Sequence, residues 1–352
     1  MSPRLCVRAV GGYRKSARRS PLETPLADLA VFYEHPQWFE PLFRELDRRG
    51  VDWAPLSIQD HTFDPADDRT PAQVVLNRLA MSSFLRQSEH ALFYSMAALG
   101  HWESLGARVI NGPGVLAYDT NKARQLSLFN ACGLAIPRTR VAHRRADVPR
   151  LAAEIGYPVM VKANVGGSGA GIIRYDSADE LEAAVADGLT PVGVDGVVLV
   201  QDYVPARDAR VIRCEVLAGK LFYAIALNGA GSTFDLCPAD VCMVDKPTNT
   251  IEAFQPPADM TAAVERIAKT SGLDVGGIEY MIDDRDGTPR FYDLNALSNF
   301  VAKPLEVLGW DPHEPFVTWL LDQIADQGKK VSESFMAASQ SGHHISARVR
   351  HK

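Results

Sequence analysis

The chain has 352 residues, of which 46% are hydrophobic and 23% are charged. This composition supplies enough apolar surface for folded cores, so it excludes disorder over the whole chain, and the length predicts two or three domains. The formal net charge of −6 conceals a body of −16 over residues 20–327, because both ends are basic. Such an acidic body argues against a nucleic-acid-binding surface.

The two basic ends are expected to be solvated tails. Residues 1–19 carry six Lys or Arg and no acid, and residues 328–352 carry five with one acid. The first segment lacks the apolar core of a signal peptide, and its resemblance to a transit peptide is weak. No run approaches the roughly 18 apolar residues of a membrane span. Five scattered cysteines argue against a disulfide framework and predict a reducing, cytoplasmic location.

Strands and helices alternate over residues 29–112, which predicts a first α/β domain with parallel strand pairing. Strands are expected at 29–33, 51–58, 74–76 and 108–111, with helices after 38 and over 90–105. Gly112-Pro113-Gly114 marks the end of this domain. Beyond it, Asp119 or Thr120 is expected to cap a helix that Gly133 stops.

Two further subdomains follow, over 113–195 and 196–327, between a basic leader (1–28) and a flexible tail (328–352). Their strands are expected at 159–162, 172–175, 197–200, 211–217, 221–227, 278–282 and 290–295, and their helices over 177–188, 259–271 and 310–325. The fold class is therefore α/β, with α+β character in the second part.

A glycine-rich segment at 164–171 reads Asn-Val-Gly-Gly-Ser-Gly-Ala-Gly. No lysine follows its last glycine, which excludes a Walker loop, and Ile172 and the strand after it exclude a dinucleotide fingerprint. Ala170 excludes a nucleophile elbow. A flap between two strands remains, with backbone amides for an anion and Lys162 at the exit of the preceding strand. A loose hairpin with a solvated lysine explains the same residues.

The two strands around the turn Asp283–Gly287 carry a candidate metal site. Asp293 and Asn295 are two residues apart and so leave the same face of their strand. A hairpin centred near Asp286 places Glu279 opposite Asp293, at about 5 Å. Like charges in that position destabilise a sheet, whereas two carboxylates and an amide oxygen suit Mg²⁺. The alternative is a solvated acidic face.

The buried run Val198–Val200 ends in Gln201, Asp202, Tyr203 and Val204. Backbone groups at such a strand end would bind an adenine, although an ordinary strand exit explains the pattern equally well. Asp208 and Arg210 follow on the next element. Cys237 and Cys242 lack tight metal spacing and are interpreted as buried thiols.

Taken in order, these segments resemble the ATP-grasp superfamily, in particular the branch that holds glutathione synthetase and glutamyl ligases. The resemblance covers about residues 74–325 and is densest over 108–300. The signatures that carry it are Asn77-Arg78, Arg108–Asn111, Asn121-Lys122 and Ile136–Thr139, followed by the glycine segment and the hairpin. It implies an ATP-grasp fold behind an N-terminal pre-ATP-grasp α/β domain.

The resemblance also implies roles for individual residues. Lys122 and Lys162 would bind nucleotide phosphates under a flap that holds Gly167, Ser168, Gly169 and Gly171. Gln201, Asp202, Tyr203 and Val204 would bind adenine, and Asp208 the ribose. Glu279, Asp293 and Asn295 would hold Mg²⁺, or Mn²⁺ in its place.

Two departures from the branch concern the metal and the reacting phosphate. The branch commonly has Asp, then Glu-x-Asn, where this chain has Glu279, then Asp293-Leu294-Asn295, so the two acids are exchanged. It also has an arginine where this chain has Asn228. That leaves Arg210 and Arg213 as the candidate catalytic cations.

The function implied is an ATP- and Mg²⁺-dependent carboxylate–amine ligase that forms an amide through an acyl phosphate. Its substrates would be an acid and an amine, of the amino-acid or short-peptide class, and the family often forms homo-oligomers. The alternatives are a small-molecule kinase of the same fold and a nucleotide-binding regulatory protein without turnover. The acceptor is expected between the first domain and the loops near 228–240 and 298–303, within reach of Arg78, Arg210, Arg213 or Lys303.

Overall fold

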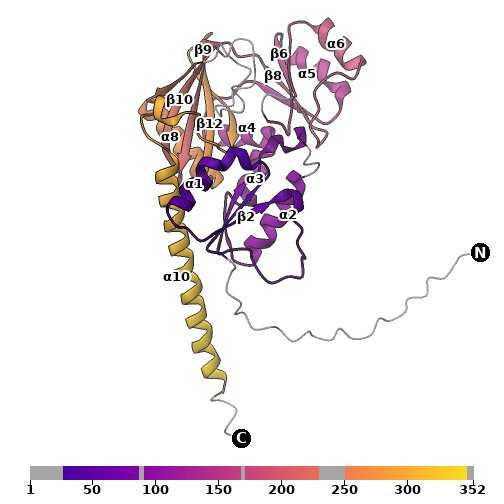
Figure 1. Ribbon diagram of the computed structural model, residues 1–352. Helices are drawn as coiled ribbons and strands as arrows, with labels where there is room; N and C mark the ends of the chain where they lie inside the picture. The colour runs from indigo at the N-terminus through magenta and orange to yellow at the C-terminus, as the bar shows by residue number, and fades with distance from the viewer. Residues whose placement is uncertain (1–26, 87–90, 168–170, 230–249, 347–352) are drawn as a thin grey trace, which may run out of the picture.

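The first sheet is built from short apolar runs, as the sequence predicts. A computed structural model describes residues 27–86, 91–167, 171–229 and 250–346, without the side chains of 84–85 and 334–346. The strands are β1 (Leu29–Tyr33), β2 (Trp53–Ser57), β3 (Val74–Arg78) and β4 (Arg108–Ile110), in the order β2-β1-β3-β4. All three pairings are parallel, and helices α1 (Glu40–Arg48) and α2 (Ala91–Ser104) connect them (Figure 1).

The second sheet is antiparallel and has the order β5-β8-β6-β7. Its strands are β5 (Thr139–Ala142), β6 (Val159–Ala163), β7 (Ile172–Tyr175) and β8 (Val198–Asp202), packed against α5 (Val148–Ile155) and α6 (Ala178–Ala186). The boundary predicted after residue 195 is wrong, because β8 pairs with β5 and β6 and therefore belongs to this central sheet.

The third sheet is also antiparallel and has the order β11-β10-β9-β12-β13. Its strands are β9 (Ala206–Leu217), β10 (Lys220–Asn228), β11 (Thr250–Phe254), β12 (Val275–Asp283) and β13 (Pro289–Asn295). Helix α8 (Ala258–Ser271) packs on one face through Val264 and Ile267. The other face shares a core with the first sheet, which joins Leu76 of β3 to Ile225 of β10.

The helical segment after Gly112 differs from the prediction. It forms two helices, α3 (Pro113–Asp119) and α4 (Lys122–Ala131), and Asn121 caps the second by accepting a hydrogen bond from the Arg124 N–H. The prediction that Asp119 or Thr120 caps this helix is wrong, because Asp119 closes α3 and is buried. Leu126 and Phe129 of α4 pack with Phe291 of β13.

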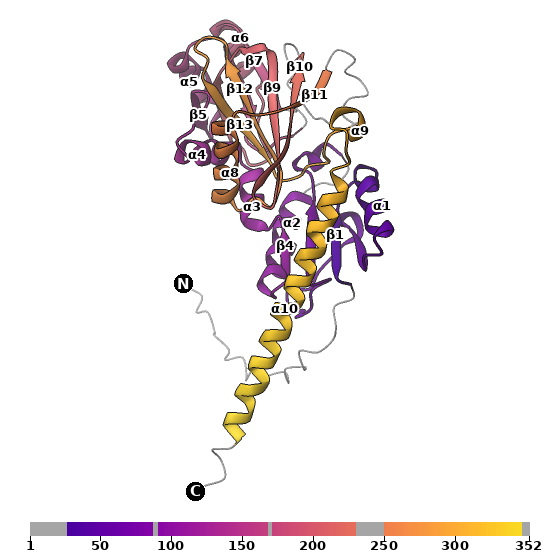
Figure 2. The same cartoon turned by 90° about the vertical axis from the view of Figure 1, so that its left-hand side faces the viewer.

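The C-terminal helix α10 (His313–Ser346) is much longer than predicted. The helix was expected to end near residue 325 and to give way to a flexible tail at 328, but it continues through residues 328–346. No proline interrupts it after Pro315. Figure 2 shows its first half beside the first sheet and its second half extending past it. None of the helices described combines the length and apolar composition needed to cross a membrane.

Five short elements complete the described chain. They are η1 (Pro36–Phe39), η2 (Ile58–Asp60), η3 (Met81–Leu85), η4 (Arg145–Asp147) and α9 (Pro304–Val307). Ser168, Gly169, Cys237, Cys242 and residues 1–26 of the basic leader lie outside the described residues.

Candidate active site

The hairpin of β12 and β13 brings the predicted acids together, as the sequence suggests. Glu279 pairs with Asp293, and Gly277 with Asn295. Nearer the turn the pairing is shifted by one residue, so that Tyr280 faces Phe291. Tyr292 is therefore the extra residue of a β-bulge, and this bulge sets the register at the acids.

Asp293 is held by a lysine from another element. Lys122, the first residue of α4, places its Nζ 2.6 Å from Asp293 Oδ1. Burial lowers the pKa of Lys122, but the carboxylates of Asp293, Glu279 and Asp119 together outweigh that effect and raise it overall. The helix is fixed to the strand by Gln125, whose side chain donates to the Leu294 carbonyl at 2.8 Å and accepts from the Leu294 N–H at 3.1 Å. The lysine is thus aimed at the carboxylate by its helix.

Glu279 lies deeper in the sheet and is 5% exposed. Its Oε1 accepts from Arg213 Nη1 at 2.9 Å, and its Oε2 accepts from the Tyr292 hydroxyl at 2.9 Å. Burial raises the pKa of Glu279, and the Arg213 guanidinium opposes that rise. Gly277 makes room for Arg213, because a Cβ at that position would lie 2.6 Å from the guanidinium carbon.

Lys162 of β6 reaches the same cluster from the central sheet. Its Nζ lies 5.9 Å from the centre of the Tyr292 ring. Burial lowers the pKa of Lys162 to about 8, and repulsion by the Lys122 ammonium adds to this effect. Two lysines from different elements therefore converge on the hairpin that carries the two acids.

The glycine segment lies between two strands as predicted, and these strands, β6 and β7, pair antiparallel. Gly171 has a φ of +72°, and a Cβ there would lie 2.9 Å from the Ala163 Cβ, so the position favours glycine. Gly167 approaches the first domain, with its Cβ position 3.1 Å from the Ser82 Cβ. Asn164 accepts from the N–H groups of Lys122 and Ala123, which ties the segment to the start of α4.

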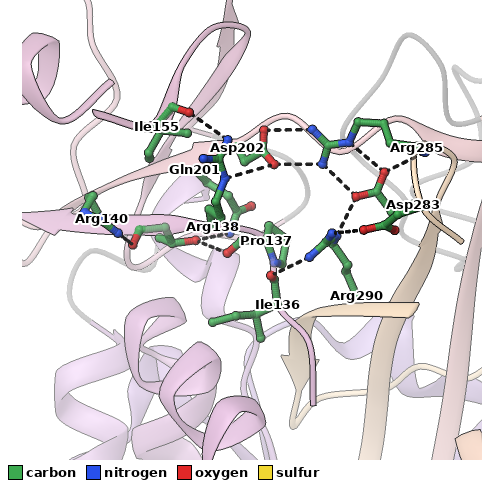
Figure 3. Close-up of polar contacts among 12 residues, drawn as sticks. Ile136, Pro137, Arg138, Arg140, Ile155, Gln201, Asp202, Asp283, Arg285 and Arg290 are labelled. Atoms are coloured by element: carbon green, nitrogen blue, oxygen red, sulfur yellow. Dashed lines mark hydrogen bonds and ion pairs between the residues drawn. The ribbon is translucent and has the colours of Figure 1, made fainter. Parts of the chain in front are cut away.

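The predicted adenine strand is anchored by an ionic network (Figure 3). Asp202 accepts from Arg285 at 2.9 Å, and Arg285 and Arg290 both bond Asp283. The Arg138 guanidinium lies 3.9 Å from Asp202. The Asp202 carboxylate therefore joins the central sheet to the β12–β13 hairpin.

Some of the other polar groups at Gln201–Val204 also form hydrogen bonds within the protein. The Gln201 amide donates to the Thr139 hydroxyl at 2.9 Å. The backbone N–H groups of Asp202 and Tyr203 donate to the Arg138 and Pro158 carbonyls. Val204 is buried at the strand exit. Adenine binding at Gln201–Val204 stays a prediction, and it would use backbone groups other than these two N–H groups.

The structure separates the two predicted catalytic arginines. Arg210 and Arg213 are three apart on a regular part of β9, so their side chains leave opposite faces. Arg213 contacts Glu279, whereas Arg210 Nε donates to Asn228 Oδ1 at 2.8 Å and Nη2 contacts Glu252 at 2.9 Å. Asp208 is exposed and adopts a φ of +55°. Only Arg213 joins the lysine–acid cluster.

Two buried acids near the cluster were missed by sequence reasoning. Asp119 is 7% exposed, its Oδ2 has no hydrogen-bond partner among the described residues, and burial raises its pKa to about 7. Glu215 is fully buried and accepts from Arg213 Nε at 2.6 Å. The signal for Glu215 was available, since residues 213 and 215 share one strand face. Asp119 was missed because it was interpreted as a helix cap, a role that would leave its side chain at the surface.

Glu279, Asp293 and Asn295 supply oxygen ligands of the kind that a hard divalent cation prefers, but too few to complete its shell alone. No group of three or more His, Cys, Asp and Glu side chains that could hold a metal occurs among the described residues. Glu279 and Asp293 supply carboxylates, and Asn295 lies 3.4 Å from each. Two acids and an amide suit Mg²⁺ when phosphate oxygens complete the shell.

Comparison with known families gives a match over the region that contains this cluster. Residues 121–300 match the family model of the carbamoyl-phosphate synthase L chain, ATP binding domain. A probable alpha-L-glutamate ligase of Enterobacter sp. (strain 638) is 28% identical over 211 residues, which are 58% of this chain and 64% of that protein. Probable alpha-L-glutamate ligase 1 of Pseudoalteromonas atlantica is 29% identical over 143 residues, 40% and 46% of the two chains. The chain thus spans less than two thirds of these relatives.

Solved structures agree on the fold. The ATP-grasp ligase PsnB complexed with its minimal precursor has a TM-score of 0.60 at 21% identity, over 86% of this chain and 99% of that one. The D-alanine–D-alanine ligase of Bacillus anthracis has a TM-score of 0.59 at 17% identity, over 87% and 98%. At these identities the likeness establishes the fold, and the predicted ATP-grasp fold with an N-terminal α/β domain is confirmed.

Proposed function

Because the chain belongs to the ATP-grasp superfamily, through the carbamoyl-phosphate synthase L chain ATP-binding domain, we propose that it is an ATP- and Mg²⁺-dependent carboxylate–amine ligase. The observation that carries the proposal is the convergence of Lys122 and Lys162 on the hairpin of Glu279 and Asp293. Cations beside a carboxylate pair suit a polyphosphate and its metal. The proposed partners are a small-molecule acid and amine, and the proposed location is the cytoplasm.

The proposed reaction has two steps. A substrate carboxylate oxygen attacks the γ-phosphorus of ATP, ADP leaves, and an acyl phosphate forms. An amine then attacks the acyl carbon and loses a proton, and phosphate leaves as the amide forms. The chain's contribution is positioning and charge compensation, as in other phosphoryl transfers.

Each residue of the cluster has a part in this scheme. Lys122 and Lys162 would bind the phosphates, and the half-buried setting makes their charge more effective than in water. Glu279, Asp293 and Asn295 would hold Mg²⁺, which neutralises phosphate charge when bound. For that, the Lys122 ammonium would exchange Asp293 for a phosphate oxygen. Gly167 and Gly171 would frame a flap that excludes water from the acyl phosphate.

Arg213 is the proposed cation nearest the reacting groups, since it contacts Glu279 directly. Arg210 would act differently, because its guanidinium lies beside Asn228, where the related branch has an arginine. A nucleotide-binding protein without turnover is the second candidate, and Asn228 is the observation that favours it.

The proposal is tested with the full chain, ATP and Mg²⁺ or Mn²⁺, offered a panel of acids combined with amines. We expect ADP and phosphate in equal amounts and an amide by mass spectrometry, only with the correct pair. AMP with pyrophosphate would overturn the mechanism. ADP with a stable phosphorylated product and no free phosphate would indicate a kinase. Stabilisation by ATP without ADP release for any pair would indicate the regulatory alternative.

A further inference from the structure

Arg78 is a buried arginine whose terminal nitrogens have no hydrogen-bond partner. It ends β3 and is 1% exposed, and neither Nη1 nor Nη2 is paired in the described part of the chain. Its guanidinium carbon lies 5.1 Å from the centre of the Phe316 ring, a cation–π contact that offsets part of its charge. Burial lowers the pKa of Arg78 only to about 10, so the group is cationic at neutral pH. A buried cation without a hydrogen-bonded anion destabilises a fold.

Glu215 presents the complementary group from the third sheet. It is fully buried, Arg213 occupies its Oε1 at 2.6 Å, and its Oε2 has no partner among the described residues. The carboxylate of Glu215 acts electrostatically on Arg78, yet the two side chains form no ion pair within 4.0 Å in the described structure. Arg78 and Glu215 are therefore two buried, opposite charges that each keep unpartnered polar atoms, and one bridging group could satisfy both.

The position of this pair within the fold supports a ligand. Arg78 stands at the carboxyl end of a parallel strand, the edge at which α/β sheets bind ligands. Glu215 is separated from the acid Glu279 by the Arg213 guanidinium alone, because Arg213 contacts both. The subsite therefore lies beside the proposed reaction centre.

The loop at 298–303 closes the same region. The Phe300 ring packs on Phe316 with centroids 5.4 Å apart, and Phe316 in turn lies under Arg78. Phe300 has a φ of +58°, a strained conformation for a non-glycine residue that occurs preferentially at functional sites. Since Arg78 and Glu215 are covered, a ligand reaches them only when a neighbouring side chain moves.

We propose that Arg78 and Glu215 form the subsite for the unreacted carboxylate and the amino group of an amino-acid substrate. The substrate carboxylate bonds the two Arg78 nitrogens, and its ammonium donates to Glu215 Oε2. This assignment rests on the proposed function and names the substrate class of the same site. It makes Arg78 a specificity-determining residue that touches neither nucleotide nor metal.

The experiment measures the thermal unfolding midpoint with ATP, Mg²⁺ and each standard L-amino acid. For the most stabilising amino acid, calorimetry compares its Kd with that of its α-amide, which lacks the carboxylate charge, and of the acid lacking the amine. We expect wild type to bind the amino acid roughly tenfold to hundredfold tighter than either analogue. In Arg78→Met the preference over the amide should disappear, whereas Arg78→Lys should keep part of it.

Stability separates this role from a structural one. Removing an unpaired buried charge should leave the Tm of Arg78→Met unchanged or raised, while a structural arginine would lower it. The matched control is Arg108→Met in the adjacent strand β4, where Arg108 pairs with Asp274 at 2.5 Å. That variant should lose stability and keep the preference for the carboxylate.

Two outcomes would overturn the subsite. One is that no amino acid stabilises the wild type, and the other is that Arg78→Met retains the preference over the amide. If Arg78→Met does not fold, the wild-type Kd values for the amino acid, its α-amide and the acid that lacks the amine still test whether both charged groups of the ligand are recognised. Amino-acid binding without ADP release for any pair would overturn the proposed function alone. Turnover with a pair that contains no amino acid would overturn the subsite alone.

Discussion

The Lys122 ammonium lies 2.6 Å from an oxygen of Asp293 and joins the first turn of α4 to the last strand of the third sheet. The two groups come from positions 171 residues apart in sequence. The contact depends on Gln125, one turn further along α4, which bonds both backbone groups of Leu294. A helix thereby places a cation on a carboxylate that, in the proposed function, also binds a metal.

Substitution of the two acids should abolish metal-dependent turnover. Glu279→Gln and Asp293→Asn keep the side-chain shape and remove the charge, so ADP release at saturating ATP should fall at least about hundredfold. The Mg²⁺ concentration for half-maximal rate should rise. The control is Asp284→Asn in the turn of the same hairpin, which is exposed and pairs with Arg207. An unchanged Mg²⁺ titration in both acid variants would refute the metal assignment.

Nucleotide affinity should depend on the protonation of Lys162. Its pKa of about 8 means that the side chain is cationic below that pH and neutral above it. The Kd for ATP should therefore rise above pH 8, by up to about tenfold per pH unit. Lys162→Arg remains charged throughout and should give a flat profile, as should the weaker-binding Lys162→Met. ATP titrations by fluorescence or calorimetry between about pH 6.5 and 9.5, a range that spans the Lys162 pKa, check this prediction. A profile in Lys162→Met that matches wild type would contradict it.

Gln125→Ala should destabilise the chain through its backbone contacts. It leaves the buried N–H and carbonyl of Leu294 without their partner, which costs about 1–3 kcal/mol. Urea unfolding should show a lower midpoint at an unchanged m-value. Ser127→Ala, on the exposed side of the same helix, should change stability by less than about 0.5 kcal/mol. Equal urea midpoints for the two variants would mean that the Gln125–Leu294 hydrogen bonds do not stabilise the packing of α4 on β13.

Two glycine-to-alanine changes should have opposite effects. In Gly277→Ala the new Cβ would lie 2.6 Å from the Arg213 guanidinium carbon, so Arg213 must move and stability should fall by about 1–3 kcal/mol. ADP release should fall with it. Gly100→Ala, inside α2 with no atom within 4 Å of the new Cβ, should instead gain about 0.5–1 kcal/mol. An active, stable Gly277→Ala would show that Arg213 does not need its position.

The hairpin shows what local chemistry can predict and where it fails. The turn Asp283–Gly287 was found, and the pairing of Glu279 with Asp293 was right. The residue pairs next to the turn are nevertheless shifted by one residue from the predicted pairing. The bulge at Tyr292 compensates for this shift, so that Glu279 still pairs with Asp293. At this bulge the Tyr292 hydroxyl bonds Glu279 within the hairpin, and its ring lies 5.9 Å from Lys162 Nζ of the central sheet, which local sequence does not reveal.

Edge strands were the main omission in the fold. β5 and β11 lie at the edges of their sheets, and half or more of their residues are only partly buried or exposed. Neither has the apolar run that predicted the central strands. The separation of Arg210 from Arg213, by contrast, follows from the two-residue period of a strand and was available from their numbers. What the sequence lacked was the partner of each arginine, which is set by cross-strand neighbours.

Asn111 has a consequence for the size of the ligand. Its side chain donates to the carbonyls of Val275 and Ala296 and accepts from the N–H groups of Asp274 and Val275. It directly follows β4, the neighbour of the strand that carries Arg78, and bonds the start of β12, the neighbour of the strand that carries Glu215. We therefore expect the Asn111 amide to fix the distance between the Arg78 guanidinium and the Glu215 carboxylate. Selectivity for ligand length would then be set by a residue that no ligand touches.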